Sequence, residues 1–126
     1  MYDLCYTNHP DETAHGVTAI LIKTTSAYYE QLQYAEPVIQ ATSVRVKRPL
    51  RDMTIAAVYC LLQQNLKAEH FEVFFQTLGP CFLAGGDFNN KNMLWGSRLT
   101  TTKGRKLAKV IQAQNYSYLL TGSPTY

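Results

Sequence analysis

Apolar runs separated by polar turns divide the chain into short strands and two helices. Val17–Ile22, Thr54–Cys60 and Cys81–Ala84 are continuous apolar runs too short for helices, and each predicts a buried strand. Val38–Val46 alternates in its second half and predicts a half-buried strand. The following turn contains Pro49, so this strand and the next are expected to form a hairpin.

Two segments have helical spacing of their apolar residues. Lys67–Leu78 places phenylalanines on one face and ends at Gly79 and Pro80, which terminate helices. Lys103–Gln114 has a second apolar stripe, with Thr102 as its candidate N-cap. Strands therefore come both as hairpin neighbours and as strand–helix–strand. This mixture predicts an α/β sandwich with mixed, partly antiparallel sheets.

The terminal segments add little to this pattern. Met1–Gly16 is polar and turn-like, and Tyr118–Leu120 is a candidate short strand. With 126 residues the chain holds at most one ordinary domain. Its apolar runs are too short to span a membrane, and no signal peptide is expected at the N-terminus.

Composition changes this picture only slightly. Hydrophobic residues make up 46% and charged residues 17%, which is typical of a globular protein. A net charge of +3 permits binding to a polyanion without requiring it, and the basic segments Arg45–Arg51 and Lys103–Lys109 are first interpreted as solvated surface. Three cysteines with no metal-ligand spacing suit reduced thiols in an intracellular protein.

The chemistry is concentrated in Gly85-Gly86-Asp87-Phe88-Asn89, directly after a predicted buried strand. The glycines allow a sharp turn and close approach of a ligand. If the backbone stays extended, Asp87 and Asn89 point the same way, and a carboxylate beside an amide suits phosphoryl transfer. On its own, however, the pentapeptide is more often an ordinary turn.

The surrounding segments give this motif a context. Ala84–Asn89, Trp95–Arg98 and Thr102–Arg105 occur in this order, preceded by His15–Ile20 and Ile55–Cys60 and followed by Pro124-Thr125-Tyr126. Over nearly the whole chain, this series resembles the endonuclease/exonuclease/phosphatase domain of Jockey-type non-LTR retrotransposons. The resemblance implies an incomplete four-layer α/β sandwich, with residues 1–126 lacking the domain's N-terminal and C-terminal strands.

The resemblance also implies roles for single residues. Tyr59 would contact the scissile phosphate, Asp87 would orient or deprotonate the attacking water, and Asn89 would hydrogen-bond the phosphate. Further contacts to substrate DNA would come from a second set: Trp95, Ser97, Arg98, Lys103 and Arg105. Trp95 is also interpreted as a packing anchor, and without the resemblance Tyr59 would be taken as a core tyrosine.

Other parts of the family pattern lie outside this chain. The family binds a divalent cation, usually Mg²⁺, through an upstream glutamate, and its general acid/base histidine lies downstream, so no metal ligand is assigned here. The three histidines, His9 and His15 included, are taken as surface or loop residues. Leu61 and Leu62 replace a proline-containing turn, and Asn92 stands where a histidine is common.

The resemblance thus implies a fragment of a magnesium-dependent endonuclease that nicks target DNA for integration and is inactive as this isolated chain. Its partners would be DNA and, through a reverse transcriptase domain, the element's RNA, with the nucleus as the place of action. Two alternatives remain: another phosphoesterase of the same superfamily, and a non-catalytic, weakly nucleic-acid-binding module. The target site and the oligomeric state do not follow from the sequence.

Overall fold

The computed structural model describes residues 1–8, 17–60, 67–88 and 102–117. These residues belong to two compact units. The first comprises Met1–Leu62 and Phe74–Phe88, and the second comprises Gln63–Val73 and Asn89–Tyr126. The first unit contains every described strand, so it also contains the sheet edge at which the candidate site lies.

The centre of the first unit is a mixed five-stranded sheet. Strand β5 (Ile39–Val46) pairs antiparallel with β6 (Met53–Cys60), as the hairpin pattern predicts. Strand β6 pairs in parallel with β7 (Phe82–Asp87), which returns to the sheet after helix α1 (Ala68–Thr77). The expected strand–helix–strand unit with adjacent parallel strands is therefore confirmed.

Two short strands complete this sheet. Strands β3 (Tyr28–Glu30) and β4 (Tyr34–Ala35) both pair antiparallel with β5, giving the order β3-β5-β6-β7 with β4 also on β5. They lie between β2 and β5, where the sequence predicted no strand. The resulting sheet is mixed and partly antiparallel, as predicted.

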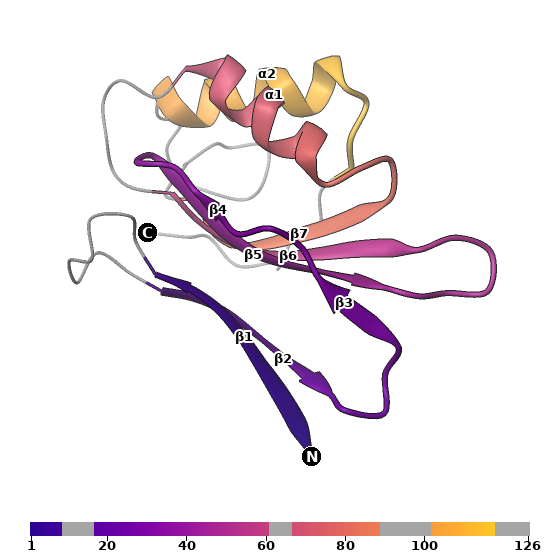
Figure 1. The fold of residues 1–126 in the computed structure, drawn as a ribbon. Helices are drawn as coiled ribbons and strands as arrows, with labels where there is room; N and C mark the ends of the chain where they lie inside the picture. Colours follow the sequence, from indigo (N-terminus) through magenta and orange to yellow (C-terminus); the bar gives the residue numbers. More distant parts are fainter. Residues whose placement is uncertain (9–16, 61–66, 89–101, 118–126) are drawn as a thin grey trace, which may run out of the picture. The chain divides into compact units, whose positions relative to one another are not determined.

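A two-stranded sheet lies on one side of the five-stranded sheet (Figure 1). It consists of β1 (Tyr2–Asn8) and β2 (Val17–Lys23), which pair antiparallel along their whole length. The expectation that Met1–Gly16 is turn-like was therefore wrong for Tyr2–Asn8. The alternation of β1 was overlooked because its inward-facing residues, Cys5 and Thr7, are small and not strongly apolar.

A buried cluster of threonines joins the two sheets. The Thr42 hydroxyl on β5 lies 2.8 Å from the hydroxyl of Thr7 and 2.9 Å from that of Thr18. Thr42 also lies within hydrogen-bond distance of the Thr18 carbonyl, 3.0 Å away, and Thr7 donates to the Ala41 carbonyl at 3.3 Å. Because each hydroxyl has a partner, the cluster can be buried without a large desolvation penalty.

Side-chain hydrogen bonds also join β1 to β3. The Tyr28 hydroxyl donates to Asp3 at 2.6 Å, and this bond raises the pKa of Tyr28 to about 12. The Cys5 thiol donates to Glu30 at 3.2 Å. Burial, reinforced by the Glu30 carboxylate, raises the pKa of Cys5 to about 11. The thiol therefore stays protonated at neutral pH and is a poor nucleophile.

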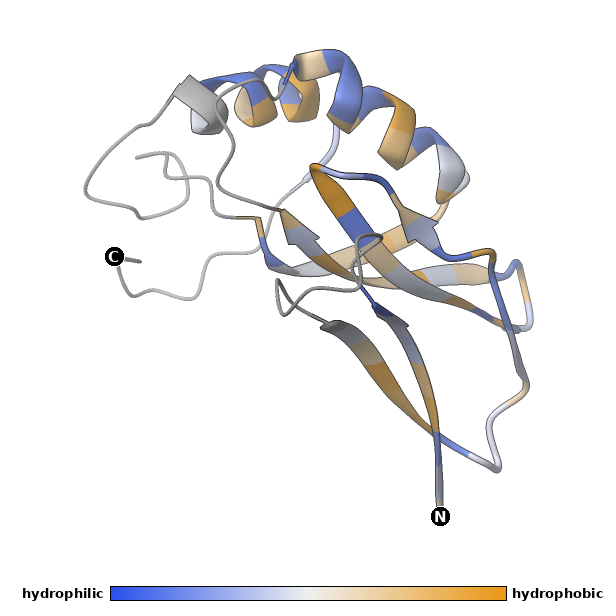
Figure 2. Ribbon diagram, turned by 60° about the vertical axis from the view of Figure 1, so that its left-hand side comes forward, coloured by the Kyte–Doolittle hydropathy of each residue, from blue (hydrophilic) through white to orange (hydrophobic). Residues whose placement is uncertain are grey.

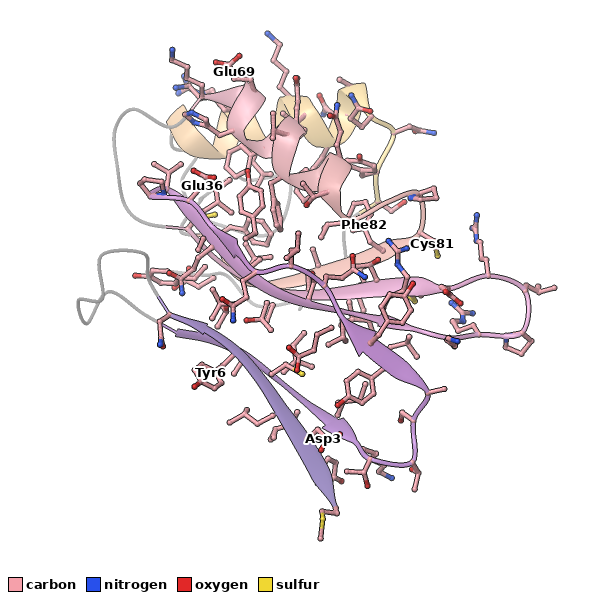
Figure 3. The ribbon with its side chains drawn as sticks, viewed as in Figure 1. Asp3, Tyr6, Glu36, Glu69, Cys81 and Phe82 are labelled. Atoms are coloured by element: carbon pink, nitrogen blue, oxygen red, sulfur yellow. The ribbon has the colours of Figure 1, made fainter. Side chains whose placement is uncertain are left out.

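Aromatic rings cover the opposite face of the sheet. Phe75 of α1 stacks on Phe82 of β7, which Figure 3 labels, with ring centroids 5.7 Å apart. Phe74 of α1 meets Tyr34 edge-on, with ring centroids 5.0 Å apart. This face and the threonine cluster together enclose β5. Ile39 to Val44 are consequently all buried, so the prediction of a half-buried strand was wrong.

The second unit contributes α2 (Thr102–Ala113), one residue longer at its start than the predicted helix. Of its predicted stripe of Leu107, Val110 and Ile111, the first two are buried and Ile111 is partly exposed. Thr102 is the first residue of α2, and its proposed capping side chain lies outside the described residues. The candidate strand at Tyr118–Leu120 also lies outside them.

The outer face of the β1–β2 hairpin is strongly apolar. Tyr2 and Leu4 are each 58% exposed, Tyr6 is 53% exposed and Leu21 is 68% exposed. The register places Leu4 opposite Leu21, and Tyr6 points away from the five-stranded sheet (Figure 3). Figure 2 shows apolar colour along both strands. An apolar sheet face of this kind is rarely left open to water.

Candidate functional site

The candidate site lies where parallel strands β6 and β7 end. In the register of the two strands, Tyr59 is the partner of Asp87. Paired residues in a sheet project from the same face, so both side chains lie on the face turned toward the β1–β2 hairpin. Tyr59 is half-buried and Asp87 is exposed. The register thus brings Tyr59 and Asp87 to one face at one end of the sheet, whereas Asn89, the third residue of the implied site, lies outside the described residues.

Strand β7 reaches this site without the expected turn. The sequence placed the end of the strand at Ala84, whereas the ladder continues through Gly85 and Gly86 to Asp87. Parallel pairing with β6 therefore holds Asp87 on rigid backbone. This placement favours a functional residue over an ordinary turn residue.

The two glycines of β7, Gly85 and Gly86, differ in the space around them. Gly86 has φ +140°, and a Cβ there would lie 2.1 Å from the Val58 carbonyl oxygen, so only glycine fits. Gly85 lies on the same face as Asp87, and a Cβ there would meet nothing within 4 Å. Its neighbour across the ladder is Ala57. Small residues thus leave open space directly beside Asp87 and Tyr59.

A third polar residue continues this row across the sheet. Gln40 on β5 is the register partner of Tyr59 and is 1% exposed. Its side-chain nitrogen donates to the Thr7 carbonyl of β1 at 3.4 Å. Gln40 was not among the residues that the sequence indicated for the site. The signal was a glutamine inside an apolar segment, where a polar side chain needs a specific partner.

The remaining predicted site residues are not brought together by the described structure. Asn89, Trp95, Ser97 and Arg98 lie outside the described residues, as do Leu61, Leu62 and Asn92. Lys103 lies in α2, and Arg105 is exposed on the same helix in the second unit. Their roles in binding DNA stay predictions.

Potential metal ligands do not gather in the described part of the chain. Within residues 1–8, 17–60, 67–88 and 102–117, no three His, Cys, Asp or Glu side chains are arranged to hold a metal ion. His70 lies in α1 and accepts a hydrogen bond from the Lys67 amide at 2.9 Å. It is thus a partly exposed helix residue, which is compatible with the expected surface position. His9 and His15 lie outside the described residues.

The arrangement suits a phosphate ester bound at the sheet edge. A carboxylate at Asp87 can orient water or accept its proton, and a phenol at Tyr59 can donate to a phosphate oxygen. The open space at Gly85 lets a ligand approach the backbone.

No helix among the described residues has the length and apolar character needed to cross a membrane.

Comparison with known proteins agrees with this geometry. A family model described as endonuclease-reverse transcriptase matches residues 53–126, a span that begins at β6 and includes both Tyr59 and Asp87. In fold, the chain matches the endonuclease domain of TRAS1, a telomere-specific non-LTR retrotransposon, with a TM-score of 0.70 and 20% identity. That match covers 96% of this chain and 56% of the TRAS1 chain.

Curated relatives point the same way. The chain is 33% identical over 110 residues to the probable RNA-directed DNA polymerase from transposon BS of Drosophila melanogaster, covering 87% of this chain and 12% of that protein. It is 30% identical over 125 residues to the RNA-directed DNA polymerase from mobile element jockey of the same species, covering 99% of this chain and 14% of the relative.

The chain therefore spans only a small part of these relatives. The family model, however, covers more than half of the chain, and the fold match is independent of it. The resemblance to Jockey-type elements is confirmed, and the chain belongs to the endonuclease–reverse transcriptase family, with the α/β fold of a retrotransposon endonuclease domain.

Proposed function

We propose that residues 1–126 form part of a domain that nicks target DNA so that a non-LTR retrotransposon can integrate. The observation that carries this proposal is the register of Tyr59 with Asp87 beside the open space at Gly85. The fold match supports it, and its 56% coverage of the TRAS1 chain suggests that further strands complete the sandwich.

In the proposed reaction, water attacks phosphorus and the bond from phosphorus to the 3′ oxygen breaks. Asp87 orients the water and accepts its proton, while Tyr59 donates a hydrogen bond to a phosphate oxygen. Asn89 would add a second hydrogen bond to the same phosphate. In this proposal the leaving 3′ oxygen takes its proton from a general acid of the complete domain.

Endonuclease folds of this family generally use a divalent metal, and we propose Mg²⁺ for the complete domain. The described residues do not fit that ion, because no ligand cluster is found among them. A second candidate function for the isolated chain is a non-catalytic module that binds nucleic acid weakly, which is in keeping with the exposed cationic side chains of Arg48, Arg51 and Arg105. Element RNA would be engaged through a reverse transcriptase domain, and the complete protein would act in the nucleus.

A nicking assay on supercoiled plasmid tests the proposal. With Mg²⁺, the 126-residue chain should convert no more plasmid to open circles than a protein-free control. Loss of one proton-transfer group alone typically costs about 10²–10⁴-fold in rate. A chimera that restores both flanks from an intact relative should nick.

Matched substitutions in that chimera identify the site. Asp87→Ala should abolish nicking, and Tyr59→Phe should lower the rate by about 10²–10³-fold if its hydroxyl supports the transition state. Glu69→Ala is the control, because Glu69 is an exposed carboxylate in the first turn of α1. Equal activity of the Asp87 and Glu69 variants would refute the assignment. Nicking by the 126-residue chain itself would refute the predicted inactivity.

A further inference from the structure

A second feature lies at the opposite end of β6 from the candidate site. The turn between β5 and β6, residues Lys47–Asp52, projects from the sheet at the right of Figure 1. We call it the basic turn. All six of its residues are exposed, and three of them, Lys47, Arg48 and Arg51, are cationic. Asp52 is its single acidic residue.

The cations of the basic turn are available to a ligand. In the part of the chain that the structure describes, Lys47, Arg48 and Arg51 form no ion pair with a carboxylate. The one side-chain hydrogen bond found for Arg48 there goes to the Met53 sulfur at 3.3 Å, which is a weak acceptor. The neighbouring Arg45 differs, since its guanidinium lies over the Tyr29 ring at 5.9 Å.

Firm backbone supports this turn on both sides. Val46 and Met53 are still paired in the ladder, and the Lys47 amide donates to the Ala27 carbonyl at 2.9 Å. On the other side, the Thr54 amide donates to the Cys81 carbonyl at 3.0 Å. The turn therefore begins and ends on ordered strands, so that less entropy is lost when it binds a partner.

The apex of the turn is apolar, although it is fully exposed. Leu50 is 100% exposed and follows Pro49, with an arginine on each side of the pair. A single exposed leucine is ordinary on a protein surface. Leucine or proline flanked by arginines is, however, the chemistry that proteins use in the DNA minor groove, where cations contact phosphates and an apolar side chain meets base edges.

We propose that the basic turn is a second contact for double-stranded DNA, separate from the candidate catalytic site. Arg48 and Arg51 bind phosphates, and Leu50 enters the minor groove between them. The choice of duplex DNA as the partner rests on the proposed function. From Met53 to Tyr59, β6 extends about 20 Å, or roughly six base pairs of duplex. The turn therefore contributes to affinity and not to the chemical step.

Binding of a fluorescent 30-base-pair duplex to the 126-residue chain, measured by anisotropy at several salt concentrations, tests this proposal. The variant Arg48→Ala/Arg51→Ala should weaken binding roughly tenfold or more at 0.1 M salt. The slope of log affinity against log salt should become shallower by about 1.8, since each lost phosphate contact removes about 0.9.

The control variant Lys67→Ala/Lys109→Ala removes the same charge from two other exposed positions and should change affinity by less than about twofold. Leu50→Ala should weaken binding without changing the slope, because an apolar contact releases no counterion. Leu32→Ala is its control, since Leu32 is 96% exposed elsewhere on the same sheet unit. Circular dichroism should confirm that all four variants are folded.

Equal weakening by the two charge-removing variants would overturn the proposal, because only net charge would then matter. Undetectable binding of the duplex by the unmodified chain would also overturn the proposal. Equal effects of Leu50→Ala and Leu32→Ala on affinity would overturn it as well. If binding depends on the basic turn while the flank-restored chimera fails to nick, then the proposed endonuclease function fails and the DNA contact stands.

Discussion

Replacing Gly86 with alanine should destabilise the fold more than any other single methyl addition near the site. The new Cβ would lie 2.1 Å from the Val58 carbonyl oxygen and 2.9 Å from the Val58 nitrogen, both backbone atoms of the paired strand. An ordinary contact begins near 3.4 Å, so β7 and β6 would have to separate by more than 1 Å at this point. That movement would break ladder hydrogen bonds directly beside Asp87.

Two costs add in this substitution. A non-glycine residue held at φ +140° costs about 1–3 kcal/mol in backbone strain. Forcing a methyl group into filled space costs about 1–3 kcal/mol more. The sum of roughly 2–6 kcal/mol is a large part of the roughly 5–15 kcal/mol that stabilises a typical domain. We therefore expect Gly86→Ala to be largely unfolded under conditions in which the parent chain is folded.

Gly85→Ala is the matched control, because it adds the same methyl group one residue away where nothing lies within 4 Å. Its effect should be within about 1 kcal/mol, and it can be stabilising, since alanine restricts the unfolded chain. Urea unfolding followed by far-ultraviolet circular dichroism measures both free energies. If the two variants unfold at the same urea concentration, the close approach of Gly86 to Val58 is not real.

Three further measurements test other parts of the structure. Folding raises the pKa of Cys5 to about 11 and that of Tyr28 to about 12, so the folded state favours the protonated form of both side chains. The stability that they add is therefore complete below about pH 9 and is lost as the pH rises through 11 and 12. The urea midpoint should fall over this range, and less so in Cys5→Ala; an identical pH profile would contradict the cause. Thr42→Val should cost about 1–3 kcal/mol in urea unfolding by leaving buried hydroxyls unpaired, and an unchanged midpoint would contradict a stabilising threonine cluster. Leu4→Lys and Leu21→Lys should each reduce light scattering by the concentrated chain, and unchanged scattering would exclude the outer hairpin face as the cause of association.

The sequence predicted the central strand–helix–strand unit because its signals are local and strong. The apolar run of β6, the phenylalanine stripe of α1 and the Gly79-Pro80 stop need no distant partner to be interpreted. The pairing of Tyr59 with Asp87 follows from the same unit, since adjacent parallel strands end at one edge. The family resemblance identified the two residues as site candidates, and the parallel pairing of β6 with β7 explains why they lie side by side.

Other features depended on tertiary contacts that no local pattern records. Strand β1 alternates, but its more apolar residues, such as Leu4, face outward while Cys5 faces inward, so its pattern suggests the wrong buried face. Burial of Ile39 to Val44 in β5 requires covers on both faces of the sheet. Gln40 lies beside Tyr59 only because of the register between β5 and β6. That register is set by strand pairing over the whole β5–β6 hairpin, which no local sequence pattern shows.

The buried threonines also determine which alignments of the chain are tolerated during folding. Thr42 meets Thr7 across 35 positions of sequence and Thr18 across 24, so these bonds close only after much of the first unit has been assembled. A slip of β5 by one residue would turn Thr42 to the opposite face and present Ala41 or Ser43 to the hairpin. Misaligned chains would then bury unsatisfied hydroxyls, whereas a purely apolar contact would tolerate the slip. The threonine cluster thus destabilises slipped registers late in folding. The register that it favours also keeps Gln40, Tyr59 and Asp87 in one row across the sheet.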